Sequence, residues 1–152
     1  LNDIPLYGLE SMEPVKDFDF MGFTLQYEMS YTNIVNMLDL AHIPLYAKDR
    51  KGLQNIVFAG GVCAYNPEPL ADYIDFFSLG EGEDITVEIV SLYDRAKQEG
   101  WSKNAFLHAV AKIPGVYVPS FYRHAYHEDG TLAAIVPLEG APETVTKRII
   151  EV

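Results

Sequence analysis

The segment QNIVFAGGVCAYNPEPLADYIDFFSLGEGED, residues 54–84, decides the fold class. It contains two short apolar runs, residues 56–59 and 74–79, and each run stops at glycine. Such runs, when helix-like sequence follows them, are typical of buried strands in a parallel sheet with helical crossovers. Ligands of these sheets bind beyond the carboxyl ends of the strands, so we expect any binding site to lie near these glycines.

The flanking sequence continues the same α/β pattern. A first strand is predicted over residues 20–25, and an amphipathic helix follows it. The apolar residues of that helix recur at helical spacing: Ile34, Met37, Leu38 and Ala41. A short helix is expected near residues 70–73. Two longer helices follow, the first from residue 84 to a glycine cap at Gly100 and the second beginning at Ser102 and broken by Pro114.

The C-terminal part changes character. Residues 116–126 are rich in Val, Tyr and Phe, residues 127–130 have turn chemistry, and residues 131–136 resume an extended pattern, which predicts a β-hairpin. We therefore divide the chain into an α/β domain (1–115), a hairpin extension (116–136) and a segment (137–152) that runs along the surface or toward a neighbouring domain.

Composition excludes several classes of partner. The chain of 152 residues is 49% hydrophobic, which is enough for one domain with a core. Its net charge of −11 repels phosphate backbones and anionic membranes, so no nucleic-acid partner is expected. No apolar run approaches the roughly 20 residues that cross a bilayer, and the first residues lack the pattern of a signal peptide. We expect no membrane partner and a cytoplasmic location.

The residues that could carry chemistry are few. Cys63 is the only cysteine, so the chain can form no internal disulfide and no thiolate cluster for an iron–sulfur centre or zinc. We interpret Cys63 as a small buried residue. The four histidines, His42, His108, His124 and His127, show no metal-ligand spacing. No residue set indicates catalysis, so no catalytic or metal-binding residue is assigned.

Polar and glycine residues follow each predicted strand, and these form the candidate cofactor site. Gln26 and Tyr27 follow the first strand and could hydrogen-bond a flat polar ligand, or could lie near the helix start without a ligand. Gly60 and Gly61 allow close backbone approach to a ligand, or only a tight strand exit. Gly80, Glu81 and Gly82 precede a helix whose amides could bind an anion, but the carboxylates favour structural capping.

Three runs carry a family resemblance: FDFMGFTLQYEMSYTNIVNMLDLAHIPLYAKDR (18–50), FAGGVCAYNPEPLADYIDFFSLGEGE (58–83) and IPGVYVPSFY (113–122). The chain resembles the amino-terminal region of a bacterial family of uncharacterised radical S-adenosylmethionine (SAM), iron–sulfur oxidoreductases with a cobalamin-binding-like domain. The resemblance implies a Rossmann-like fold. It also implies that Thr24, Leu25, Gly60 and Gly61 match the strand ends that flank the nucleotide tail of cobalamin.

Two motifs of the wider cobalamin-dependent enzymes are missing. The sequence lacks the Asp-x-His-x-x-Gly motif that supplies a cobalt ligand, and it lacks the CxxxCxxC motif that holds a 4Fe-4S cluster. The resemblance therefore implies a non-catalytic accessory domain of a parent enzyme that uses a 4Fe-4S cluster and SAM. The domain either binds cobalamin or is a cofactor-free docking domain. Its expected partner is the catalytic radical SAM domain of the same parent chain, toward which residues 137–152 would lead.

The amino end has a further implication. Members of the family have additional sequence ahead of this region, enough for one or two strand–helix units. Without those units the strand at residues 20–25 would lie at an open edge of the sheet, where unpaired backbone groups favour pairing with another chain. A homodimer across that edge is therefore a hypothesis.

Overall fold

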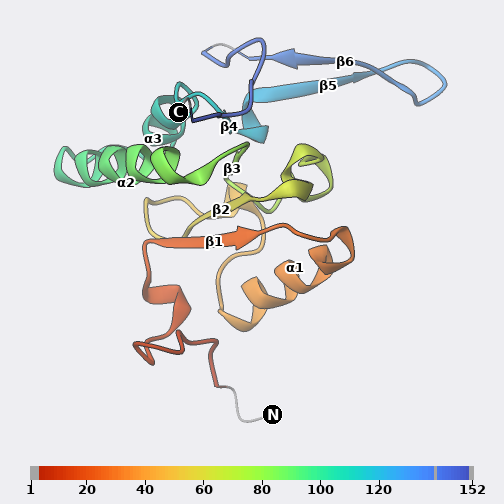
Figure 1. Cartoon of the computed structure of the whole chain (residues 1–152). Helices are drawn as coiled ribbons and strands as arrows, with labels where there is room; N and C mark the ends of the chain where they lie inside the picture. Colours follow the sequence, from red (N-terminus) through yellow and green to blue (C-terminus); the bar gives the residue numbers. More distant parts are fainter. Residues whose placement is uncertain (1–3, 139, 151–152) are drawn as a thin grey trace.

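The computed structural model describes residues 4–138 and 140–150 (Figure 1). A four-stranded sheet has the order β1-β2-β3-β4, in which the first three strands are parallel and the fourth is antiparallel to the third. Its strands are β1 (Phe20–Thr24), β2 (Ile56–Gly60), β3 (Phe76–Ser78) and β4 (Val116–Tyr117). The predicted α/β fold with a mostly parallel sheet is confirmed.

Helices cover both faces of this sheet. They are α1 (Tyr31–Leu40), α2 (Gly82–Gln98) and α3 (Lys103–Val110). In β2, Val57 and Ala59 pack with the α1 side, whereas Ile56 packs with α2 and α3 on the other side. This alternation is the two-residue period of a strand buried on both faces. It explains why residues 56–59 read as a continuous apolar run.

The predicted helix caps and boundaries are close to those observed. Helix α1 lies where the apolar spacing predicted it, and α2 ends just before Gly100. The Ser102 side chain accepts a hydrogen bond from the Ala105 N–H at 3.2 Å, so Ser102 caps α3 as predicted. The short helix expected at residues 70–73 is instead a 3₁₀ turn, Glu68–Leu70.

The extended segment predicted over residues 116–126 is broken in two. Val116 and Tyr117 join the main sheet as β4, a 3₁₀ turn follows at Pro119–Phe121, and only then does β5 (Tyr122–Tyr126) begin. Pro119 has no N–H and cannot continue a strand ladder, which explains the break. Strand β5 pairs antiparallel with β6 (Leu132–Pro137), so the C-terminal hairpin is confirmed.

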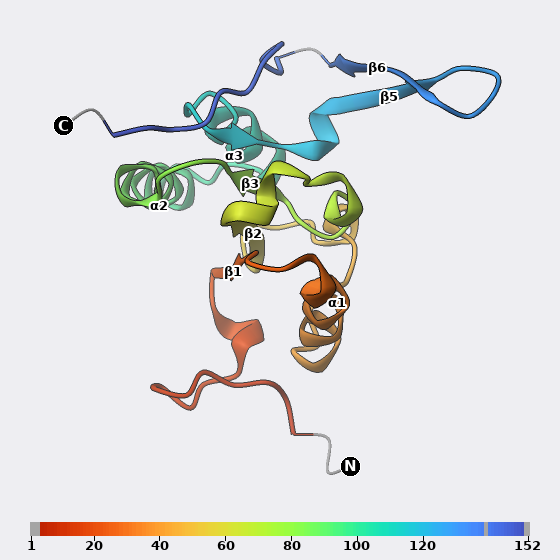
Figure 2. The same ribbon diagram turned by 45° about the vertical axis from the view of Figure 1, so that its right-hand side comes forward.

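The sheet separates the two ends of the molecule. The N-terminal segment lies beyond β1, and the β5–β6 hairpin lies beyond β4, on the opposite side (Figures 1 and 2). Strand β1 is an edge strand, as expected. Parts of the predicted divisions, residues 1–3, 139 and 151–152, lie outside the described residues. Within the described residues, no helix combines the length and the apolar character that crossing a membrane requires.

Candidate functional site: the carboxyl edge of the sheet

The loops that follow β1, β2 and β3 meet at the carboxyl edge of the sheet around a pocket of about 280 Å³, which we call the edge pocket. Four residues of the sequence-predicted site line it: Gln26, Gly61, Gly80 and Glu81. The remaining lining residues are Val62, Tyr65, Lys147, Arg148 and Ile149. The structure thus brings together residues that follow three different strands, as the parallel topology predicted.

The other five predicted residues do not line the edge pocket. Leu25 is fully buried and Tyr27 is exposed. Thr24 and Gly60 end the paired strands β1 and β2, where they are register partners. Gly82 is the first residue of α2. The structure therefore divides the predicted residues into those with a surface at the edge pocket and those that build the strand ends beneath it.

The conformation of Gly61 is explained by the protein itself. Its φ is +96°, and a Cβ there would lie 2.8 Å from the Leu25 carbonyl oxygen. The same carbonyl accepts the Cys63 N–H at 2.9 Å, and the Leu25 N–H donates to the Gly60 carbonyl at 2.7 Å. These bonds hold the first two strand ends together. The tight strand exit considered from the sequence is thus sufficient to require this glycine.

The Gly80-Glu81-Gly82-Glu83 turn begins α2. Glu81 is the N-cap residue, and Glu83 and Asp84 lie in the first turn, where carboxylates are favoured by the helix dipole. The Glu81 N–H donates to the Arg148 carbonyl at 3.1 Å, and the Glu81 carboxylate accepts the Ile150 N–H. A free anion site at this helix start is not supported, because acidic side chains and the chain's own C-terminal segment surround it.

Sequence reasoning missed the contribution of that C-terminal segment. Lys147, Arg148 and Ile149 line the edge pocket, although residues 137–152 were expected only to follow the surface or lead away. The Arg148 guanidinium pairs with the Glu88 carboxylate of α2 at 2.6 Å. The available signal was the basic Lys147-Arg148 pair in an otherwise strongly acidic chain.

Exposed apolar side chains surround the edge pocket. Val62, Tyr65 and Ile149, which we call the apolar rim, expose 63%, 57% and 58% of their surface. They come from the loop after β2 and from the C-terminal segment. Single exposed apolar residues are common, whereas large contiguous apolar patches mark surfaces that bind another molecule.

Cys63 lies behind this surface and is buried, as interpreted from the sequence. Its carbonyl accepts the Tyr31 hydroxyl at 3.1 Å. Burial and the nearby Glu28 carboxylate raise the pKa of the Cys63 thiol. Because the thiolate is the nucleophilic form, these surroundings disfavour a reactive role. In residues 4–138 and 140–150, no three His, Cys, Asp or Glu side chains are arranged to hold a metal ion.

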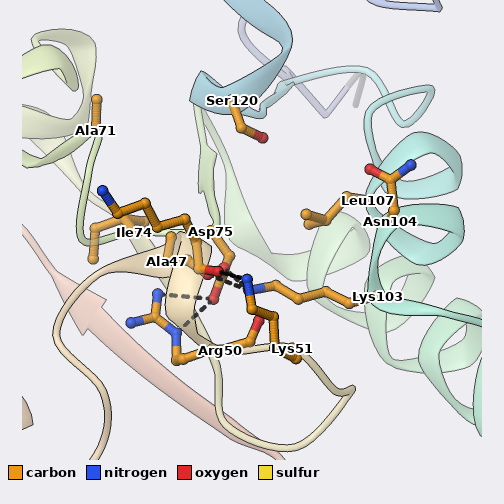
Figure 3. Close-up of a pocket in the computed structure, with 11 residues that line it drawn as sticks. Ala47, Arg50, Lys51, Ala71, Ile74, Asp75, Lys103, Asn104, Leu107 and Ser120 are labelled. Carbon is orange, nitrogen blue, oxygen red and sulfur yellow. Dashed lines mark hydrogen bonds and ion pairs between the residues drawn. The ribbon is translucent and has the colours of Figure 1, made fainter.

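A second polar region lines a different pocket, shown in Figure 3, and was not predicted. Asp75, Arg50 and Lys103, which we call the Asp75 cluster, are buried beside a pocket of about 340 Å³. One carboxylate oxygen of Asp75 accepts Arg50 Nη2 at 3.1 Å, and the other lies 2.5 Å from Lys103 Nζ. The cluster joins the loop before β2, the start of β3 and the start of α3.

The donors of the Asp75 cluster are occupied within the protein. Arg50 also donates to the carbonyls of Pro44, Leu45 and Tyr73 at 2.6–2.9 Å. Lys103 donates to the carbonyls of Ala47 and Arg50, each at 2.8 Å.

The Asp75 carboxylate also accepts a hydrogen bond from the Val57 N–H of β2 at 2.8 Å. The Asp75 side chain thus replaces a backbone carbonyl of β3 as the partner of Val57. This shortens β3 relative to the predicted 74–79. The saturated donors indicate a structural ion cluster, not a ligand site.

A third polar network joins the Asn-Pro-Glu-Pro connector to the C-terminal strands. One Glu68 oxygen accepts the Tyr117 hydroxyl at 2.5 Å, and the other lies 2.9 Å from His124 Nε2. Burial and the Glu68 carboxylate raise the pKa of Tyr117. The network therefore links the connector after β2 to β4 and to the hairpin.

These features define an α/β domain with a mostly parallel sheet, whose loops gather at the carboxyl edge around a small pocket with an apolar rim. Residues 1–119 match the family described as radical SAM proteins, N-terminal, and the chain belongs to this family.

One relative extends the comparison. The chain is 34% identical over 94 residues to the uncharacterized protein MJ0966 of Methanocaldococcus jannaschii, in a match that covers 59% of this chain. The same match spans 19% of the length of that relative. No solved structure matches the chain significantly.

Proposed function

We propose that this chain is a non-catalytic accessory domain of a radical SAM enzyme, and that its carboxyl edge docks the catalytic domain of the same parent protein. The parent would hold a 4Fe-4S cluster and SAM and would act in the cytoplasm. Because Fe–S clusters are held by several cysteine thiolates and this chain has one cysteine, another part of the parent would hold the cluster.

The observation that carries the proposal is the apolar rim around the edge pocket. Val62, Tyr65 and Ile149 are exposed and lie together around one pocket, whereas the other exposed large apolar side chains do not line it. Burial of apolar surface is the main driving force of protein association, and an aromatic residue such as Tyr65 is enriched in interface cores. The rim also includes Ile149 of the C-terminal segment, which would lead toward the catalytic domain of the proposed parent.

The Asp75 cluster and the Cys63 thiol favour a docking role over chemistry. The donors of the Asp75 cluster are occupied inside the protein, and the Cys63 thiol has a raised pKa. Neither region offers a group that is both available and activated for reaction. The exposed side chains that line the edge pocket combine Val62, Tyr65 and Ile149 with the polar Gln26, Glu81 and Lys147, a mixture that suits a protein surface.

Docking can be tested by titrating this chain with the catalytic portion of its parent in a calorimeter. The Val62→Asp variant should weaken the affinity at least about tenfold, because a charge would enter an apolar contact. Val87→Asp is the matched control, since Val87 on α2 is equally exposed (66%) but lies away from the edge pocket. Equal affinities of the two variants would contradict the proposed interface.

Cobalamin binding at the same edge is the second candidate function. It is favoured by the parallel strand ends and by the residues that the family resemblance matches to the nucleotide tail: Thr24, Leu25, Gly60 and Gly61. The fit is poor. The Cβ direction of Gly61 is filled by the Leu25 backbone, and about 280 Å³ is below the usual size of a cofactor pocket. Both observations count against a corrin ring or its tail at the edge pocket.

Equilibrium binding of hydroxocobalamin and adenosylcobalamin distinguishes this candidate from docking. Visible absorbance that stays with the protein after desalting, and that a Tyr65→Asp substitution at the edge pocket abolishes, would establish the cofactor role. Loss of all absorbance on desalting would favour docking.

A homodimer across β1 remains a separate proposal. Strand β1 pairs with β2 on one side and is the edge of the sheet on the other. Sedimentation of the chain at several concentrations tests it. A dimeric mass that Thr24→Pro abolishes would support pairing through this edge, because Thr24 is exposed at the end of β1, and a monomeric mass throughout would exclude it.

A further inference from the structure

The C-terminal segment passes directly over the turn between β3 and α2. The Arg148 N–H donates to the Leu79 carbonyl at 2.8 Å, and the Glu81 N–H donates to the Arg148 carbonyl at 3.1 Å. These two bonds flank Gly80 and form a parallel bridge between Gly80 and Arg148. The segment is therefore bound through its backbone, as an added strand is bound in peptide recognition.

Two glycines from separate loops make room for the Arg148 backbone. Gly80 has φ +103°, and a Cβ there would overlap the Arg148 carbonyl oxygen. Gly115 has φ +93°, and a Cβ there would lie 2.8 Å from the Leu79 carbonyl oxygen and 3.2 Å from the Arg148 nitrogen. By contrast, Gly100 and Gly130 also have positive φ, but a Cβ at either would meet open space. Turn geometry alone explains why Gly100 and Gly130 are glycine, whereas Gly80 and Gly115 also lie against the C-terminal segment.

Acidic side chains of the turn and of α2 bind the C-terminal segment. The Arg148 guanidinium pairs with Glu88 at 2.6 Å, and the Glu81 carboxylate accepts the Ile150 N–H. Lys147, Arg148 and Ile149 all line the edge pocket. The segment thus pairs with α2 through Arg148 and also forms part of the wall of the edge pocket.

We infer that the Gly80-Glu81-Gly82-Glu83 turn is a docking site for the basic, extended linker of this chain, residues 147–150. The inference goes beyond the proposed function, because it assigns an intramolecular partner to the turn whether or not another domain docks at the apolar rim. Binding of the linker here fixes the direction in which the chain leaves the sheet and places Ile149 in the rim.

Amide hydrogen exchange of the 152-residue chain tests the inference. In Gly80→Ala, the new methyl group displaces the linker, and protection of the Arg148 amide should fall at least about tenfold, the effect of losing roughly one hydrogen bond. Gly100→Ala is the matched control, because it also places alanine at positive φ but touches no other segment. It should leave Arg148 protected. The Asp75 amide, which donates to Val57 in the sheet, reports whether the core stays folded.

A second variant tests the charge without backbone strain. Glu88→Gln keeps the helix and removes the charge opposite Arg148, so Arg148 protection should fall severalfold while Asp75 protection is unchanged. Unchanged Arg148 protection in both Gly80→Ala and Glu88→Gln would overturn the inference. An equal loss in Gly80→Ala and Gly100→Ala would also overturn it, because positive φ alone would then account for the effect.

Discussion

The Asp75 cluster and the carboxyl edge are both polar regions beside a pocket, but they are built in opposite ways. In the Asp75 cluster, Arg50, Asp75 and Lys103 are buried, and their donors reach acceptors inside the protein. At the carboxyl edge, Glu81 binds the C-terminal segment, and the apolar rim is left exposed. The comparison teaches that a pocket lined by charges is not by itself a site. Surface that the fold leaves unused is the better indicator of a partner.

The largest expected effect would come from Asp75→Ala. The substitution leaves Arg50 and Lys103 buried without their counter-ion, so the free energy of unfolding should fall by about 3–5 kcal/mol. Urea unfolding measures it. Asp19→Ala removes a carboxylate whose pairing with Lys97 is solvent-exposed, and should cost about 0–1 kcal/mol. Similar losses in the two variants would mean that burial does not distinguish the cluster from a surface pair.

An intermediate effect is expected at Tyr117, which belongs to the Glu68 network. The Tyr117 pKa is raised in the folded state, first by burial and then by Glu68, so folding favours the neutral phenol. Stability from this group is complete below about pH 10, where unfolded tyrosine begins to ionise, and is lost as the pH rises further. Tyr117→Phe should cost about 1 kcal/mol at neutral pH and make the alkaline decline less steep.

Unfolding by urea at a series of pH values between neutral and strongly alkaline measures this profile. Tyr126→Phe is the control, because Tyr126 is exposed on the hairpin. A Tyr117→Phe profile as steep as that of the unsubstituted protein would show that the Tyr117 phenol does not contribute to the alkaline decline.

The smallest effect on stability is expected at the apolar rim. Val62→Ser changes an exposed side chain outside both cores, so the free energy of unfolding should change by no more than about 0.5 kcal/mol. A thermal unfolding scan would detect a larger loss of stability. A large loss would place Val62 in the packing of the domain itself and would weaken the case for a partner surface.

The sequence predicted those features that depend on local pattern. The apolar runs around Val57 and Phe77 gave the parallel sheet, and Ser102 gave the start of α3. Gly61 was correctly placed at the edge because strands of a parallel sheet end on the same side. In each case neighbouring residues carry enough information, since periodicity and capping act within a few positions.

The missed features depend on contacts between distant residues. From the sequence, Asp75 was assigned to a strand. Its partners Arg50 and Lys103 come from a loop and a helix, and no local pattern predicts that these elements come close to Asp75. From the sequence, Arg148 was assigned to a tail with few residues expected in the core, although its backbone pairs with the turn at Gly80. A charged residue inside an apolar run and a basic pair in an acidic chain are the sequence signals that could have indicated these contacts.

The central claim is that the carboxyl edge is a docking surface, and hydrogen exchange in the parent protein tests it most directly. Amides of residues 61–65 and 147–150 would be compared between the 152-residue chain and the same residues within the parent. We predict that these amides are more protected in the parent, while those of the β5–β6 hairpin are unchanged. Equal protection of residues 61–65 in both proteins would contradict docking at this edge.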